Sequence, residues 1–443
     1  MTQQGLAERN REKVWAAALI ATNCTVQIVA LGADTATLGS LAGLSNALTG
    51  AALVILARPS WQMLGASFLP VGILIAALTW AVWPDLTGSG KGDRIAPDLV
   101  AVDATQLAAL IGLLVGAAMV GARRDWVWPA LEALSAGGAA CLGIGLVLRA
   151  TEPNTVWGLP KGIFINRYTG TMLNANAMAA IHSAFAILAL GIMLAQLRGG
   201  VFGALRHRAF RIPVYGGLAA AHLVACGITG SRTAFGALVV AASLLVWWYR
   251  WSLAQNRGRF SQFLAAVAML AFALVASNLA LAERLASVGD DWETRTLIWR
   301  HYADLAANAG PHGYGLGSFA EVNRAFLPDS KLATNLWYVN AAHNVVLQTA
   351  LEGGVAYALL ICLAVAIMAA QIGANLPRSY PARLVQLALV ASCAATLTVG
   401  LDDIALNITA AATMTTSMWG LAWGRSLQNR QKRLILGRKG SQS

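Results

Sequence analysis

The sequence predicts an all-α protein that crosses a membrane many times, with about twelve transmembrane helices and one long external loop. Of its 443 residues, 57% are hydrophobic and only 12% are charged, whereas a soluble protein carries about 25% charged residues. Apolar windows near 20 residues, the length that a helix needs to cross a bilayer, recur along the chain. The connecting segments also differ in charge, which is typical of a polytopic membrane protein.

These windows predict twelve spans. They lie at 14–32, 37–57, 61–83, 99–121, 126–148, 174–197, 213–229, 233–250, 260–282, 341–371, 382–401 and 405–424. Basic residues precede the first window and no convincing cleavage site follows it, so we expect a retained signal anchor. Only Asp402-Asp403 separates the last two windows.

Charge indicates how the spans are oriented. An even number of spans places both termini on one side of the membrane, and the segments on that side hold 21 of the 32 Lys and Arg residues. Nearly all the acidic residues fall on the other side. This is the positive-inside pattern, so we expect both termini in the cytoplasm. Topology then explains most of the net charge of +12, and nucleic acid is not an expected partner.

The external segment 283–340 is the only one long enough to form a subdomain, and we expect short helices that lie over the membrane surface. Residues 294–308 have helical spacing, and Asn308-Ala309-Gly310-Pro311 is a typical helix end. The whole chain, 1–443, is expected to form a single membrane domain that carries this loop between its ninth and tenth spans.

Arginines on the external side are unexpected in a protein that follows the positive-inside rule. The candidates are Arg167, Arg232, Arg295 and Arg300. Guanidinium groups match phosphate oxygens with paired donors, so these arginines indicate a phosphate ligand. Contact with lipid phosphates is the alternative for Arg232, which lies in a tight turn between two spans. For Arg295 the alternative is a surface ion pair with Asp291.

His343 and Asn344 directly follow the long polar segment and begin an apolar window. Ionisable groups at membrane depth are costly, about 2.5–3.5 kcal/mol for a charged residue on insertion scales, and are therefore functional candidates. A histidine in this position suits a general base, with Asn344 in support. Glu352 lies nine positions later, close to the opposite face of a straight helix. It could assist His343 only if Gly353-Gly354 bends the chain; capping or pairing with another span is the alternative.

Other polar residues carry weaker signals. Asn174 and Asn176 begin the predicted span 174–197, where they could cap the helix or contact sugar or phosphate. His312 precedes a glycine-rich run, 313–317, that lacks the Lys-Ser/Thr of a phosphate-binding loop and predicts close backbone approach instead. The histidine and cysteine spacings have no metal-ligand pattern.

Together these pieces resemble the O-antigen ligase and O-antigen polymerase-like superfamily of bacterial inner-membrane glycosyltransferases. The matching pieces are 170–177, 229–233, 295–299, 311–319 and 343–354. The resemblance implies a GT-C-like membrane fold with a periplasmic active site that takes a glycan from undecaprenyl pyrophosphate. It further implies that His343 is the catalytic base and that Arg232 and Arg295 are essential. The first external loop lacks an acidic Asp-x-Asp pair, so no metal cofactor is expected.

The favoured function is an O-antigen ligase that joins O-antigen to lipid A–core. A repeat-unit polymerase or a protein O-oligosaccharyltransferase would use the same donor and a different acceptor; the short basic segment after Arg425 weighs against protein as acceptor. A lipid-linked glycan flippase or transporter is the alternative from another class. Transporters often show two related halves with binding sites at the midplane, whereas the polar residues here gather on one face.

Overall fold

The computed structural model describes residues 3–33, 35–89, 94–199, 205–251, 288–328, 333–336 and 339–440. Within these ranges the chain is helical apart from one short antiparallel pair, β1 (Thr155–Val156) with β2 (Leu159–Pro160), and a few connecting turns. Nine of the described helices are long and apolar enough to cross a membrane. The predicted all-α polytopic fold is therefore confirmed.

The first eight long helices match the predicted windows in order. They are α1 (Gln3–Val29), α2 (Ala36–Ala57), α3 (Trp61–Thr87), α4 (Pro97–Gly121), α5 (Val127–Thr151), α6 (Ala175–Leu197), α7 (Leu205–Ile228) and α8 (Arg232–Trp251). The predicted span 260–282 lies outside the described residues. The structure continues with α11 (Val288–Asn308), α12 (Phe319–Ala325), α13 (Ala333–Leu336), α14 (Val345–Gly353), α15 (Val355–Ala374), α16 (Tyr380–Asp402) and α17 (Thr409–Gly440).

The predicted single span 341–371 is wrong in one respect, because the chain breaks within it. Gly354 has φ 85 and ψ 163, values that only glycine adopts readily, and it separates the short helix α14 from the membrane-length helix α15. The predicted break between the last two spans is present: α16 ends at Asp402, a short turn follows at Ala405–Asn407, and α17 begins at Thr409.

Close helix packing in the bundle depends on small residues. Gly50 of α2 lies against the backbone of α4, where a Cβ on Gly50 would come within 2.6 Å of the Gly112 carbonyl carbon. Gly420 of α17 approaches the other side of α4, where an added Cβ would lie 2.7 Å from Ala117 Cβ. Small residues at such crossings let backbones approach and pack in the absence of water. Helix α6 is the most enclosed span and packs against α7, α8 and α16.

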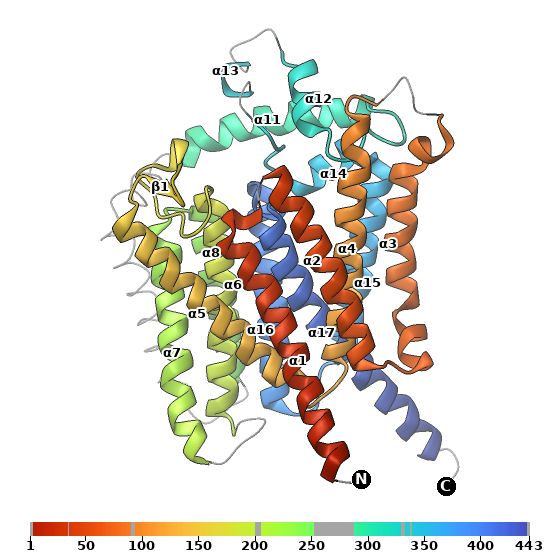
Figure 1. The fold of residues 1–443 in the computed structure, drawn as a ribbon, viewed down its shortest axis with the longest axis vertical. Coiled ribbons are helices and arrows are strands. Elements are labelled where there is room, and N and C mark those ends of the chain that lie inside the picture. Colours follow the sequence, from red (N-terminus) through yellow and green to blue (C-terminus); the bar gives the residue numbers. More distant parts are fainter. Residues whose placement is uncertain are drawn as a thin grey trace.

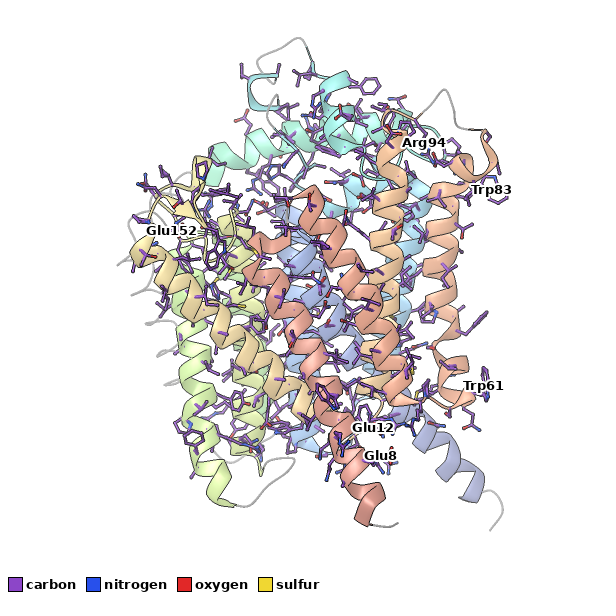
Figure 2. The ribbon with its side chains drawn as sticks, viewed as in Figure 1. Glu8, Glu12, Trp61, Trp83, Arg94 and Glu152 are labelled. Atoms are coloured by element: carbon purple, nitrogen blue, oxygen red, sulfur yellow. The ribbon has the colours of Figure 1, made fainter. Side chains whose placement is uncertain are left out.

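Tryptophans on α3 indicate how the bundle meets the membrane. Trp61 is 88% exposed and Trp83 is 52% exposed, and they lie near opposite ends of the helix (Figure 2). Their 22-residue separation corresponds to roughly 33 Å, close to the hydrocarbon thickness of a bilayer. Both chain termini lie at the Trp61 end of the bundle (Figure 1).

The segment after residue 288 covers the opposite end of the bundle, where α11, α12 and α13 lie across the ends of the spanning helices (Figure 1). Ile298 and Tyr302 of α11 pack with Phe319 of α12 and Leu351 of α14 in one buried apolar cluster. The Tyr302 hydroxyl donates a 2.9 Å hydrogen bond to Asn323. This covering segment is thereby packed onto α14, the helix that follows His343.

Candidate active site

The site lies around two carboxylates at the C-terminal end of α16, at the end of the bundle covered by α11. Asp403 is only 4% exposed, and its Oδ1 accepts a 2.7 Å hydrogen bond from the backbone N–H of Ile404. Asp402 is the last residue of α16. Two adjacent carboxylates at the end of a membrane helix are unfavourable unless cations or donors surround them, and the surrounding side chains supply both.

Arg295 of α11 is the principal counter-charge. Its Nη1 forms an ion pair with the Asp402 carboxylate and also donates to the Asp402 backbone carbonyl, and its Nη2 lies 3.9 Å from Asp403 Oδ2. The guanidinium therefore bridges both carboxylates, which an ammonium group could not do in the same geometry. The alternative in the sequence analysis, a surface ion pair with Asp291, falls on a side chain outside the described part of the structure.

Two polar residues connect Asp403 to the opposite side of the site. Asn176, at the start of α6, donates from Nδ2 to Asp403 Oδ2 at 2.6 Å. Its Oδ1 accepts a 2.6 Å hydrogen bond from Arg167 Nη2, while Arg167 Nε donates to the Thr229 carbonyl at 2.6 Å. Arg167 thus links the turn after α7 to the asparagine that contacts the central carboxylate. Asn174 caps α6 by accepting from the N–H groups of Asn176 and Ala177.

Arg232 is placed beside this cluster by its own helix. It is the first residue of α8, and the next residue, Thr233, donates its hydroxyl hydrogen bond to Asp402. The turn before it contains Gly230, which has a left-handed φ of 69°. Helix α8 therefore begins at the same carboxylate pair that Arg295 approaches from α11.

His343 approaches the same carboxylates from the chain segment that leads into α14. His343 lies just before α14, which is capped by Asn344 and begins at Val345, so His343 is outside the helix. Its φ is 52°, a left-handed backbone conformation that is unusual for a residue other than glycine. Its Nδ1 lies 3.8 Å from Asp403 Oδ1, and its side chain remains 35% exposed. One ring nitrogen thus faces a buried carboxylate while part of the ring stays accessible.

Asn344 fixes the chain directly after His343. Its Oδ1 accepts from the N–H groups of Val346 and Leu347, which caps α14, and its Nδ2 donates to the Leu401 carbonyl at 3.0 Å. A second contact holds the chain directly before His343, where the Ala342 N–H donates to Gln348 Oε1 at 3.2 Å. The left-handed histidine is therefore restrained on both sides.

Glu352 stabilises this arrangement from the far end of α14. Its Oε1 accepts a 3.0 Å hydrogen bond from Gln348 Nε2, the same side chain that accepts from Ala342. Burial and, to a lesser extent, the nearby Asp103 carboxylate together raise the pKa of the Glu352 carboxyl to about 8. Because α14 ends at Gly353 and His343 lies outside it, the helical-wheel argument that separates the two residues does not apply. Their connection runs through Gln348.

The glycine-rich run packs on the end of α14, as its composition predicts. Tyr314 N–H donates to the Leu351 carbonyl at 2.8 Å and Gly315 N–H to the Glu352 carbonyl at 2.9 Å. His312 belongs to this support: its Nδ1 lies 2.9 Å from the Trp80 carbonyl oxygen, and its ring centroid lies 4.4 Å from that of Trp80, with the two rings tilted by 32°. The His312 side chain therefore lies against α3 and is not part of the Asp402–Asp403 cluster.

Arg94, which the sequence reasoning did not single out, holds the same loop. Its side chain is 3% exposed, pairs with Asp85 at 2.9 Å, and donates to the carbonyls of His312 and Gly313 (labelled in Figure 2). Arg300, by contrast, is exposed on α11 and forms no ion pair with any other residue that the structure describes. In the described part of the chain, no group of three or more His, Cys, Asp or Glu side chains is placed to hold a metal ion.

The sequence reasoning selected the residues around the carboxylates and missed the carboxylates themselves. From the sequence alone, Asp402 and Asp403 indicate only a polar break between two predicted spans. A signal was available: several arginines on the external side require counter-charge, and an acidic pair between two apolar windows is as costly at membrane depth as a basic one.

Part of the chain is similar to a known protein family. Residues 217–362, about one third of the chain, match the family model described as O-antigen ligase. No curated protein matches the chain. The matched segment contains Arg232, Arg295 and His343. The structure adds Arg167 and Asn176 from before this segment, and Asp402 and Asp403 from after it.

Proposed function

From the O-antigen ligase-like domain at 217–362 we propose that the protein is an O-antigen ligase of lipopolysaccharide biosynthesis. It transfers O-antigen glycan from undecaprenyl pyrophosphate to lipid A–core. The bilayer is the bacterial inner membrane, the termini are cytoplasmic and the site faces the periplasm. The observation that carries the proposal is the position of His343, which faces Asp403 beside the bridging guanidinium of Arg295.

His343 acts as the general base. Because Nδ1 faces Asp403, Nε2 is the nitrogen that takes the proton from an acceptor sugar hydroxyl. The oxygen then attacks the anomeric carbon of the donor, and the bond from that carbon to the pyrophosphate oxygen breaks with its electron pair. The Asp403 carboxylate stabilises the imidazolium as it forms. Attack opposite the leaving group inverts the anomeric centre.

The arginines bind the donor pyrophosphate and stabilise its charge as it departs. Arg232 and Arg295 lie at the carboxylate pair, and Arg167 reaches it through Asn176. Arg300, exposed on the same helix as Arg295, serves as an outer contact. This mechanism uses protein cations in place of a metal ion, so we expect the reaction to be metal-independent.

Reconstitution tests the proposal. Purified protein is mixed with undecaprenyl-pyrophosphate-linked glycan and lipid A–core, with and without EDTA, and His343→Ala is the matched variant. We expect glycan on lipid A–core from the wild type in both conditions and none from the variant. Chain lengthening without lipid A–core would identify a polymerase instead. Binding of the donor without transfer to any acceptor would refute the enzyme assignment and favour a transporter.

A further inference from the structure

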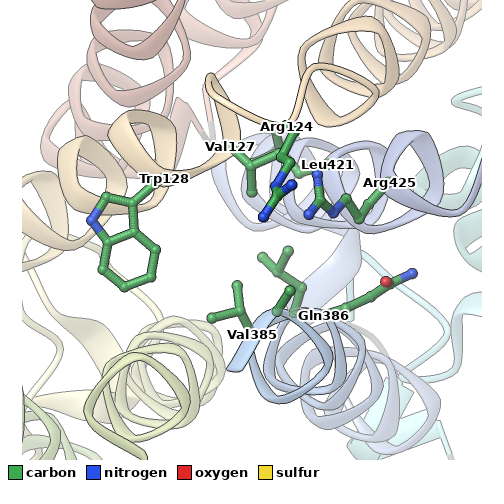
Figure 3. Close-up of a pocket in the computed structure, with 9 residues that line it drawn as sticks. Arg124, Val127, Trp128, Val385, Gln386, Leu421 and Arg425 are labelled. Carbon is green, nitrogen blue, oxygen red and sulfur yellow. The ribbon is translucent and has the colours of Figure 1, made fainter. Parts of the chain in front are cut away.

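A second site lies at the opposite end of the bundle from His343. A pocket there is lined by residues of the α4–α5 turn, α5, α16 and α17, among them Arg124, Val385, Gln386, Leu389, Leu421 and Arg425 (Figure 3). Gln386 is sixteen residues before Asp402 on α16, and Arg425 is sixteen residues after the start of α17. At 1.5 Å per residue the pocket is roughly 24 Å from the active-site carboxylates.

Two guanidinium groups converge at this pocket. Arg124 extends from the α4–α5 turn and Arg425 from α17, and Figure 3 shows the groups side by side. Burial and, to a lesser extent, the positive charge of the nearby Arg124 together lower the pKa of Arg425 to about 10. The two positive charges repel each other, and an anion between them would relieve this repulsion.

The protein itself does not supply that anion within its described residues. The two nearest acidic residues in the sequence are paired elsewhere: Asp125 with Arg9, and Glu132 with Arg211. Arg425 Nη1 donates a 3.0 Å hydrogen bond to Oε1 of Gln428, a neutral side chain. Neither Arg124 nor Arg425 forms an ion pair among the described residues, and so the cation pair is open to an external ligand.

The rest of the pocket is apolar and lies inside the bundle. Val385, Leu389 and Leu421 are at most 5% exposed, and the first two lie one helical turn apart on the same face of α16. These apolar side chains close the inner end of the pocket, and the two guanidinium groups form its mouth. Basic pockets between membrane helices on the cytoplasmic side are known to accept lipid headgroups, which bring a phosphate group to this face of the membrane.

We propose that Arg124 and Arg425 form a binding site for the phosphate group of an anionic phospholipid. The site belongs to the membrane face that carries both termini, and it is separate from the site proposed to bind the glycan donor. The paired donors of two guanidinium groups suit a phosphodiester.

Native mass spectrometry of the purified protein tests this site directly, with no need for transferase activity. Phosphatidylglycerol is titrated into wild type, Arg124→Gln, Arg124→Gln/Arg425→Gln and Arg430→Gln. Arg430 is an exposed arginine of the same helix α17 and provides the matched control. We expect the double variant to weaken the tightest lipid-binding event at least about tenfold, because it removes both charge-assisted donors to the phosphate. Arg430→Gln should bind as the wild type does.

The single variant, Arg124→Gln, controls for loss of binding through misfolding. Arg124 is exposed, so its replacement removes no packing, and we expect a several-fold loss of affinity with an unchanged melting temperature. Phosphatidylcholine should bind more weakly than phosphatidylglycerol, and millimolar inorganic phosphate should not displace the lipid. Wild-type affinity in the double variant would overturn the proposal. Displacement by inorganic phosphate would overturn the lipid assignment and make the site one for a free anion.

Discussion

His343 Nδ1 lies 3.8 Å from Asp403 Oδ1, although the two residues are sixty positions apart in the sequence. The carboxylate is buried, whereas the histidine side chain is 35% exposed. The carboxylate is fixed by Asn176 and by the N–H of Ile404, and the histidine by its left-handed backbone. A fixed carboxylate behind one ring nitrogen selects the tautomer in which the other nitrogen can accept a proton.

Asp403→Asn should therefore impair catalysis without impairing donor binding. The amide retains an oxygen for the Ile404 N–H but cannot stabilise an imidazolium. We expect kcat to fall by about 10²- to 10⁴-fold, the range for loss of general acid–base function, with little change in KM. Glycan transfer to lipid A–core provides the measurement. Asp98→Asn, an exposed carboxylate at the N-terminal end of α4, is the control, and equal rates for both variants would contradict the role of Asp403.

Arg295→Lys should also lose activity, although the charge is kept. The guanidinium contacts the Asp402 side chain and backbone and approaches Asp403 at the same time. An ammonium group cannot match this planar fork, and loss of one such electrostatic contact in a transition state costs about 10²- to 10³-fold in kcat. Arg324→Lys, in an exposed ion pair with Glu321, is the matched change and should leave the rate near that of wild type. A fully active Arg295→Lys enzyme would show that the fork geometry is not required.

Glu352→Gln should stabilise the protein in a manner that depends on pH. The pKa of the Glu352 carboxyl is raised from 4.5 to about 8, mainly by burial, so the folded state retains a proton that the unfolded state releases. Stability from this group is complete below about pH 4.5 and is lost as pH rises to about 8. Glutamine resembles the protonated form, so the variant should melt higher than wild type at pH 8.5 and nearly equally at pH 5.

The control for that experiment is Glu321→Gln, because Glu321 is an exposed carboxylate of the covering segment, paired only with Arg324 among the described contacts. Its melting temperature should differ from that of wild type by a similar small amount at both pH values. If Glu352→Gln showed the same shift at pH 5 and pH 8.5, the carboxyl would not be held in its neutral form in the folded protein.

The sequence predicted what depends on local pattern. Apolar windows located the helices, and the cost of charge at membrane depth directed attention to Arg232, Arg295 and His343. Two features depend on contacts between distant segments and had no local signal. Asp402 meets Arg295 across 107 positions, and the role of Glu352 depends on Gln348 and on a chain break at Gly354. A hydropathy window averages over such a break and therefore predicts one long span.

The glycine-rich run contacts the end of α14, and a comparison of Gly313 with Gly310 tests whether this contact matters. Gly313 and Gly310 both have left-handed φ values, 63° and 71°. A Cβ on Gly313 would lie 2.6 Å from the Glu352 carbonyl carbon, whereas a Cβ on Gly310 would meet nothing within 4 Å. Alanine at either position carries the left-handed conformational strain, about 1–2 kcal/mol. Only Gly313→Ala must also displace the end of α14, which adds about 1–3 kcal/mol for overpacking.

We therefore expect Gly313→Ala to lower the melting temperature clearly more than Gly310→Ala. Because the displaced segment contains Glu352, and Gln348 links Glu352 to the residue before His343, Gly313→Ala should also lower kcat, whereas Gly310→Ala should not. Thermal melting in detergent and the glycan-transfer assay measure the two effects separately. Equal melting temperatures would mean that the loop does not press on α14. A lower melting temperature with unchanged kcat would mean that the loop stabilises the fold without positioning His343.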